Sequence, residues 1–388
     1  MKRLTQTLAF CLLTVFTAVA QKNYVSEVWV SDLGNGKYKN PVLYADYSDP
    51  DVCAVGDDFY MTASSFNCTP GLPILHSRDL VNWKLINYAL KAIEPEEFYN
   101  KPQHGKGVWA PSIRYHNGEF YIYWGDPDFG IFMVKAKDPQ GEWDKPVLVK
   151  AGKGMIDPTP LWDEDGKVYL VHAWAGSRAA FNSVVTVCEM NPEGTKVISE
   201  PVLVFDGNDG VNHTVEGPKF YKRNGYYYIL APAGGVVTGW QLALRSKNVY
   251  GPYEVKRVMA QRSTDINGPH QGAWVETNSG ESWFVHFQDK AMYGRVIHLN
   301  PVKWTEGWPV IGEDKDGDGC GEPVRRYRKP NVGKTYPVET PAESDEFNSR
   351  RLGLQWEWHA NYQDAFGFTS DLGYMLSLIH ISEPTRPY

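Results

Sequence analysis

One unit recurs five times along the sequence, and this recurrence limits the possible folds more than any other feature. Each unit has a proline near the start of a predicted strand, then a turn with glycine, then an aromatic-rich strand. The turn glycines are spaced by 62, 48, 59 and 55 residues, and they are Gly56, Gly118, Gly166, Gly225 and Gly280. These spacings fit four-stranded sheets, and five such sheets arranged radially form a five-bladed β-propeller. We therefore predict an all-β fold; a β-sandwich would not explain the recurrence.

The turns contain the residue pairs that tight hairpins require. Asn117-Gly118 and Asn224-Gly225 are Asn-Gly pairs, which tolerate the positive φ angles of two-residue hairpin turns. The residue before each proline is driven towards an extended backbone, as at the start of a strand. The 26 prolines and 36 glycines leave little helical signal.

The sequence divides into a large repeat region and a short remainder. We predict a propeller over residues 38–329, followed by a linker over residues 330–341. Residues 342–375 start a new segment, in which positions 354–358 alternate as in a strand, but too little chain follows for a second core. Residues 376–388 (LSLIHISEPTRPY) fit neither part and look like a translated adapter or cloning scar. We expect the sequence to be a fragment of a longer protein.

Residues 1–20 have the pattern of a secretory signal peptide. Two basic residues precede an apolar run that is too short to span a bilayer, and Ala-Val-Ala at residues 18–20 forms a cleavage site. We therefore expect a secreted or periplasmic protein with no membrane segment after cleavage; a membrane anchor is the alternative. The net charge of −7 argues against a nucleic-acid partner. The sequence does not define the oligomeric state.

Four cysteines follow the predicted cleavage site, at Cys53, Cys68, Cys188 and Cys320. They show neither C-x-x-C spacing nor an accompanying histidine cluster, so a zinc site is not expected. Buried free thiols are the default prediction. A disulfide between Cys53 and Cys68 is the alternative in an oxidising compartment.

Three acidic residues stand just ahead of prolines in the repeated unit. Asp49 and Asp157 directly precede a proline, and Glu216 lies two positions before one. A group that recurs at one place in a repeated unit is brought to one place in a ring, so the three carboxyls should meet at the axis. We interpret Asp51, on the opposite strand face from Asp49, and Asp165, in an Asp-Gly turn, as structural.

Converging carboxyls in an aromatic-rich chain indicate sugar chemistry. Splitting a glycosidic bond requires one carboxyl that protonates the leaving oxygen and another that activates water or attacks the sugar. A third nearby charge can raise the pKa of the acid, because like charges resist ionising together. Aromatic residues make up 14% of the chain, and such residues stack on sugars. Glu216 suits the acid, since glutamate has the longer side chain and the higher reference pKa.

Longer motifs around these carboxyls resemble glycoside hydrolase family 43. The resemblance runs from about residue 40 to 328, and the matching segments are 40–50 (NPVLYADYSDP), 56–61 (GDDFYM), 64–66 (SSF), 76–83 (HSRDLVNW), 107–112 (GVWAPS), 157–158, 216–218 and 293–295 (YGR). That family contains β-xylosidases, α-L-arabinofuranosidases and arabinanases on a five-bladed propeller. The resemblance implies inverting hydrolysis of an oligo- or polysaccharide that contains xylose or arabinose, without distinguishing the two sugars.

The resemblance also implies roles for individual carboxyls. Asp49 matches the general base, Asp157 the carboxylate that modulates the pKa and orients the acid, and Glu216 the general acid. In an inverting enzyme the base and the acid stand about 6.5–9.5 Å apart, which leaves room for water.

Other matching positions imply contacts with the sugar. Phe66 and Trp109 match apolar walls of the sugar subsite, and core packing is the alternative for each. Arg295 matches an arginine that reaches sugar hydroxyls and the acid. Trp174 and Trp240 either line the cleft or pack within the propeller.

A calcium ion in the axial channel is a further implication of the resemblance. His270 matches the histidine near that ion, although an extra residue in this segment makes Gln271 an alternative. Residues 314–319 (DKDGDG) resemble the first half of a calcium loop. The twelfth position of that loop is Arg325 instead of Glu, which favours an acidic surface turn.

Two other functions remain open. Fructan-processing propellers also use three carboxylates, but they would be retaining and would open with Asn-Asp-Pro-Asn, where residues 48–51 read Ser-Asp-Pro-Asp. A sugar-binding propeller without catalysis is the second, and the three intact carboxyls count against it. The segment after Pro341 resembles the start of the concanavalin-like β-sandwich that many β-xylosidases of the family carry.

Overall fold

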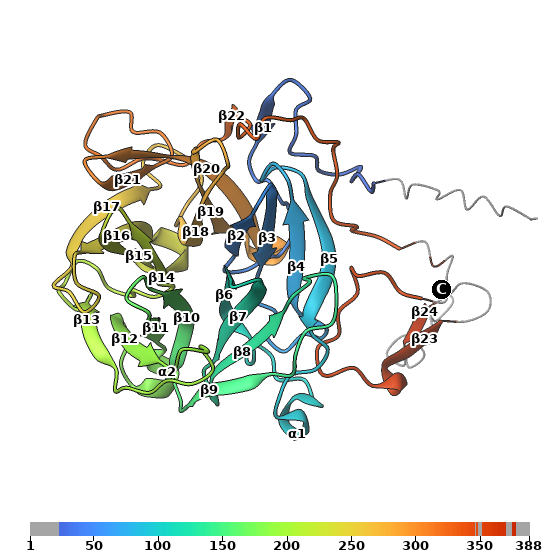
Figure 1. Ribbon diagram of the computed structural model, residues 1–388. Coiled ribbons are helices and arrows are strands. Elements are labelled where there is room, and N and C mark those ends of the chain that lie inside the picture. The colour runs from blue at the N-terminus through green and yellow to red at the C-terminus, as the bar shows by residue number, and fades with distance from the viewer. Residues whose placement is uncertain (1–22, 346, 348–350, 370–374, 378–388) are drawn as a thin grey trace, which may run out of the picture.

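The computed structural model describes residues 23–345, 347, 351–369 and 375–377, and its main body is a ring of five four-stranded antiparallel sheets (Figure 1). In each sheet the strands follow one another in chain order, and each sheet contacts its two neighbours around the ring. The predicted all-β, five-bladed propeller is therefore confirmed.

Each blade comes from one continuous stretch of chain. Blade 1 contains β2 (Asp51–Val55), β3 (Asp58–Thr62), β4 (Gly71–Ser77) and β5 (Trp83–Leu90). Blade 2 contains β6 (Trp109–His116), β7 (Glu119–Asp126), β8 (Gly130–Ala136) and β9 (Val147–Ala151). Blade 3 contains β10 (Met155–Trp162), β11 (Val168–Trp174), β12 (Val184–Met190) and β13 (Val202–Asp206). Blade 4 contains β14 (Lys219–Arg223), β15 (Tyr226–Ala233), β16 (Trp240–Ser246) and β17 (Glu254–Ala260). Blade 5 contains β18 (His270–Glu276), β19 (Ser282–Asp289), β20 (Arg295–Thr305) and β21 (Trp308–Ile311).

Helices are short and lie between the strands. They are α1 (Glu96–Tyr99), α2 (Gly176–Ala179), α3 (Gly235–Thr238) and the 3₁₀ turns η1 (Ala291–Tyr293) and η2 (Asp364–Phe366). Among the described residues, no helix has the length and apolar character needed to cross a membrane.

The innermost hairpins close through the turns that the sequence predicts. Asn117 and Gly118 join β6 to β7 with φ angles of 48° and 85°, and Asn224 and Gly225 join β14 to β15 with 51° and 74°. Two successive positive φ angles match the right-handed twist of the flanking strands, which keeps the hairpins short.

Large apolar side chains fill the space between blades. Between blades 1 and 5, for example, Phe59 and Trp83 share one core with Trp283 and Phe287, and none of the four is more than 2% exposed. Burying a large apolar side chain stabilises a fold by about 1.5–3 kcal/mol. The aromatic-rich second strand of each repeat therefore holds neighbouring blades together.

The two ends of the ring are fastened outside the blades. Strand β1 (Lys37–Lys39) pairs with β22 (Arg326–Arg328), and the Tyr38 hydroxyl donates to the Leu299 carbonyl of blade 5 at 2.8 Å. Leu43 also forms a β-bridge with Ile297. The junction of blades 1 and 5 is the place where the ring closes.

The segment after the propeller lies against blade 1. The alternation at residues 354–358 is not part of a sheet strand; Trp358 instead forms a single β-bridge with Thr69. Asn361 is buried and donates to the Ile93 carbonyl at 2.9 Å. A short pair, β23 (Gly367–Thr369) and β24 (Met375–Ser377), completes the described chain.

Some predictions fall outside the described residues or concern the cysteines. The leader at residues 1–20 and residues 378–388 of the predicted scar lie outside the described part of the chain. Cys53, Cys68, Cys188 and Cys320 are free thiols, so the alternative Cys53–Cys68 disulfide is not formed. Cys188 and Cys320 are buried, as the default prediction states, whereas Cys53 and Cys68 are only partly buried.

Candidate active site

A backbone irregularity repeats at one position in every blade. At the start of each innermost strand one residue has a positive φ angle: Asp49 (55°), Ala110 (30°), Asp157 (57°), Gly217 (58°) and Gln271 (35°). In blades 2, 3 and 5 the strand register also shifts there, as in a β-bulge. Bulges redirect side chains, and unfavourable backbone angles cluster at functional sites.

Four of the five irregular positions, those of blades 1, 2, 3 and 5, line one cavity of about 260 Å³, and in blade 4 the neighbouring residue Glu216 lines it instead of Gly217. The cavity is lined by Asp49, Phe66, Trp109, Ala110, Ile156, Asp157, Glu216, Val236, His270, Gln271 and Arg295. All seven residues that the sequence predicts for the site lie in this lining. Trp174 and Trp240 do not: Trp174 packs against Phe181, and Trp240 beneath Arg257, which agrees with the packing alternative.

The structure shows that the three acidic residues do not occupy equivalent positions in their blades. Asp49 and Asp157 occupy the irregular position itself, whereas Gly217 occupies it in blade 4, so Glu216 stands one residue earlier. In blade 5 the irregular residue is Gln271, and His270 corresponds to Glu216. Glu216 and His270 therefore share one structural position, and Asp49 and Asp157 share another.

Three donors hold the Asp49 carboxyl group in position. Its Oδ2 accepts hydrogen bonds from the Ser48 and Ser64 hydroxyls, each at 2.6 Å. Arg295 Nη1 donates to Oδ1 at 3.1 Å and also to the Ser48 hydroxyl at 2.8 Å. Within the described chain Oδ1 accepts from Arg295 alone, so this oxygen keeps lone-pair capacity for a water molecule.

Asp157 is buried and holds the turn that carries Glu216. Its Oδ2 accepts from the Gly217 N–H at 2.7 Å and from Gln271 Nε2 at 3.4 Å. Burial, followed by the Glu216 carboxyl, raises the pKa of Asp157 well above its ordinary value. A protonated carboxyl at this place can fix the Glu216 backbone without adding a second negative charge.

Glu216 is the most accessible of the three carboxyls. Its side chain is 25% exposed, against 7% for Asp49, and its Oε1 lies 2.9 Å from His270 Nε2. A proton donor must reach the leaving group, so greater exposure to the cavity suits this role.

An ionic cluster lies below the cavity, and the sequence analysis missed it. Asp51 is fully buried, and its Oδ2 accepts from Arg114 Nη1 at 2.6 Å; Lys219 Nζ lies 4.0 Å from the same oxygen. The interpretation of Asp51 as structural agrees with this arrangement. The sequence does place a charged residue, Lys219, at the start of a predicted inner strand, and this position could have indicated the cluster.

His270, the residue predicted to lie near a calcium ion, is buried and lines the cavity. His270 Nδ1 is buried without a hydrogen-bond partner in the described chain, so one ring nitrogen could face an ion. A calcium site requires several oxygen ligands. In the described part of the chain, three or more His, Cys, Asp or Glu ligand atoms lie close together only in a distant loop. The axial calcium ion stays a prediction.

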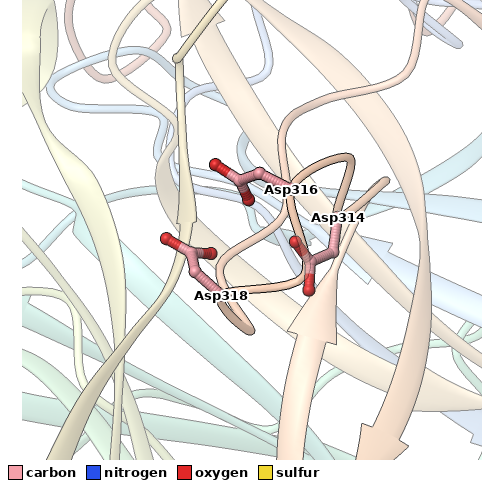
Figure 2. Close-up of side chains that lie close together, drawn as sticks. All are labelled: Asp314, Asp316 and Asp318. Atoms are coloured by element: carbon pink, nitrogen blue, oxygen red, sulfur yellow. The ribbon is translucent and has the colours of Figure 1, made fainter.

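That distant loop carries Asp314, Asp316 and Asp318, whose carboxylates gather as Figure 2 shows. Arg262 donates to Asp316 at 2.5 Å and also to Asp318. Asp314 accepts from two backbone N–H groups of its own loop. These bonds pair the acidic turn with an arginine.

Asp157 makes a testable contribution to stability. Since its folded pKa is raised above the unfolded value of about 3.9, the folded state loses stability as pH rises through the window between the two pKa values. Asp157→Asn removes this loss. We expect the variant to be less active but more stable at pH 7.

Thermal unfolding at pH 4 and pH 7 checks this expectation. The gain should shrink towards pH 4, and Asp165→Asn, in an exposed turn, serves as the control. A gain of equal size at both pH values would contradict the explanation.

The fold and the cavity together define a class of protein. Three carboxyls from blades 1, 3 and 4 line one cavity together with Phe66, Trp109 and Arg295. The family model described as "Glycosyl hydrolases family 43" matches residues 38–309. The chain belongs to this family, and the resemblance noted in the sequence is confirmed.

Individual proteins that are similar to this chain carry names that belong to the same family. The chain is 42% identical to a "Putative beta-xylosidase" of Xylanibacter ruminicola, over 86% of this chain and 61% of the relative. It is 34% identical to a "Non-reducing end alpha-L-arabinofuranosidase" of Bacteroides ovatus, over 87% of this chain and 64% of the relative. A solved xylan beta-1,4-xylosidase from Bacillus halodurans superposes with a TM-score of 0.74 at 27% identity, covering 85% of this chain and 66% of that one. The chain spans about three fifths of the length of these curated relatives.

Proposed function

We propose that this protein is an inverting glycosidase that releases xylose or arabinose from plant cell-wall glycans. The observation that carries the proposal is the cavity in which Asp49, Asp157 and Glu216 meet. Family membership supports it, since the relatives reported above are named as xylosidases and arabinofuranosidases. These names do not indicate fructan processing.

The size of the cavity supports a small sugar. A volume of about 260 Å³ lies just below the roughly 300–1,000 Å³ of pockets that hold drug-sized ligands, so one sugar ring suits it. A second cavity of about 280 Å³ adjoins it, and Phe66 lines both. Tyr44 and Trp29 border this second cavity, where the remainder of the substrate would find aromatic surfaces.

The proposed mechanism gives each carboxyl one task. Asp49, held in position by Arg295, takes a proton from a water molecule, and that water attacks the anomeric carbon from the face opposite the leaving group. Glu216 donates its proton to the departing oxygen while the bond breaks. Asp157 holds the backbone after Glu216 in position. A single displacement of this kind inverts the anomeric configuration.

Hydrolysis of two aryl glycosides tests the proposal. Nitrophenyl β-xyloside and nitrophenyl α-arabinofuranoside are the substrates, and NMR identifies the anomer that appears first. We expect one or both to be cleaved with inversion. First release of the retained anomer, or no cleavage of either substrate, would contradict the proposal.

The remaining expectations are part of the same proposal. Export to the periplasm or the medium rests on the leader pattern, and the start of a β-sandwich after Pro341 rests on sequence resemblance. A propeller that only binds sugar remains the competing function, and the Asp49 variant described below separates the two.

A further inference from the structure

Trp109 forms one wall of the cavity, and a sugar can stack on it only when its ring keeps one plane. The indole nitrogen, the single polar atom of this side chain, donates to the Gly105 carbonyl at 2.9 Å. The apolar cluster against which the ring packs consists of Ile156, Ala173 and Ala175. Two of these three side chains are single methyl groups, so the plane of the ring requires a further support.

The guanidinium group of Arg178 lies over the Trp109 ring and gives this support. The distance from Arg178 Cζ to the ring centroid is 5.5 Å, within the roughly 6 Å over which a cation and an aromatic face attract each other. Arg178 belongs to α2, which follows β11 of blade 3, whereas Trp109 opens β6 of blade 2. The contact therefore joins two blades beside the cavity, although Arg178 itself is not part of the cavity lining.

Asp128 fixes the plane of the Arg178 guanidinium group. Arg178 Nε donates to Asp128 Oδ1 at 3.2 Å, and Nη2 donates to Oδ2 at 3.3 Å. A third bond runs from Nη1 to the Ser177 hydroxyl at 2.9 Å. Two parallel bonds to one carboxylate define the orientation of a guanidinium group as well as its position. The cation over Trp109 is therefore held in a single orientation.

Backbone contacts hold α2 at a fixed distance from the loop that carries Asp128. The Ala175 N–H donates to the Gly154 carbonyl, and the Gly154 N–H donates to the Pro127 carbonyl, each at 2.8 Å. Gly154 has a φ angle of 83°, and a Cβ atom at this position would lie 2.6 Å from the Ala179 Cβ. A glycine is thus required for the close approach of α2. The same backbone path positions both partners of the ion pair.

We propose that Arg178 is a positioning residue which, together with Asp128, fixes the plane of the Trp109 ring for stacking on the sugar. The inference rests on the proposed function. A ring that is already fixed loses little side-chain freedom when the sugar binds, so affinity is gained without a new contact. Because the sugar stacks on Trp109 before and during bond cleavage, the effect belongs to binding and not to the chemical step.

The first test is Arg178→Met, which keeps an unbranched apolar stem but removes the planar cation. With whichever nitrophenyl glycoside the wild type cleaves, KM should rise about two- to tenfold, the range expected for ordering one side chain on binding. We expect kcat to stay within about a factor of two, because uniform binding affects KM alone. Inhibition by the released sugar should weaken by the same factor as KM rises. Asp128→Asn, which loosens the guanidinium group, should act in the same direction.

A double-mutant cycle with Trp109→Ala separates positioning from general structural support. In the Trp109→Ala background, Arg178→Met should cause no further loss of kcat/KM, since the ring on which it acts is absent. Arg223→Met is the matched control: this arginine also lies over a tryptophan, Trp304, at 4.5 Å and pairs with a carboxylate, Glu276, but none of the three lines the cavity. Its KM should equal that of the wild type.

Several outcomes would overturn the proposal. One is a folded Arg178→Met protein with an unchanged KM; another is an equal loss of kcat/KM with and without the Trp109 ring, which would place the effect of Arg178 elsewhere. If the methionine variant does not fold, Asp128→Asn decides the matter in the same cycle. An inactive wild type would contradict the proposed function instead.

Discussion

Asp49→Asn should lower kcat on nitrophenyl β-xyloside or α-arabinofuranoside about 10²- to 10⁴-fold, the usual contribution of a general base. The amide cannot take a proton from water, yet it has nearly the shape of the carboxylate and can still accept from Ser64. Arg295 retains the Ser48 hydroxyl and Asp289 as partners, so the fold should persist.

Calorimetry with the released sugar completes this experiment. Binding should survive in Asp49→Asn even though turnover collapses, and Asp165→Asn should behave like the wild type. A variant that keeps more than about a tenth of wild-type activity would remove Asp49 from the role of base, since general bases contribute at least about 10²-fold. A wild type that binds sugar without turnover would indicate the non-catalytic function.

Glu216→Ala should affect substrates according to their leaving groups. On xylo- or arabino-oligosaccharides, whose leaving alcohols need a proton, activity should fall about 10²- to 10⁴-fold. Aryl glycosides with acidic phenols leave with little help, so the same variant should retain much more of its activity on them. The side chain's exposure to the cavity and its contact with His270 are the structural basis for this role.

A series of phenols of increasing acidity measures this effect as a slope of log kcat against leaving-group pKa. The slope should be steeper for Glu216→Ala than for the wild type, while Glu200→Ala, an exposed glutamate, should not change it. Equal losses on all substrates would contradict the acid role.

The architecture was predictable because the five repeats can be recognised in the sequence. Pairs such as Asn117-Gly118 define hairpins locally, and their spacing defines the number of blades. The backbone offset in blade 4 was not predictable, because Glu216 and Asp49 both precede prolines and only coordinates show that Gly217 takes the irregular position.

Other differences have equally physical causes. Alternation at residues 354–358 predicted a strand, but alternation cannot identify a pairing partner, and the segment meets blade 1 through one bridge at Trp358. Trp174 and Trp240 could not be assigned from composition, since a tryptophan stacks on a sugar or on a neighbouring residue by the same physics. Lys219 was missed because side-chain burial depends on contacts across blades 1, 2 and 4.

The junction between the first and last blades has a consequence for when the protein becomes active. Asp49 precedes Arg295 by 246 positions, so the base meets its guanidinium partner only after almost the whole ring has been synthesised. A nascent chain that stops short of the fifth blade carries all three acids yet has an incomplete nucleophile-activating pair. Under the proposed function, hydrolysis therefore requires a closed ring in which the first and fifth blades meet.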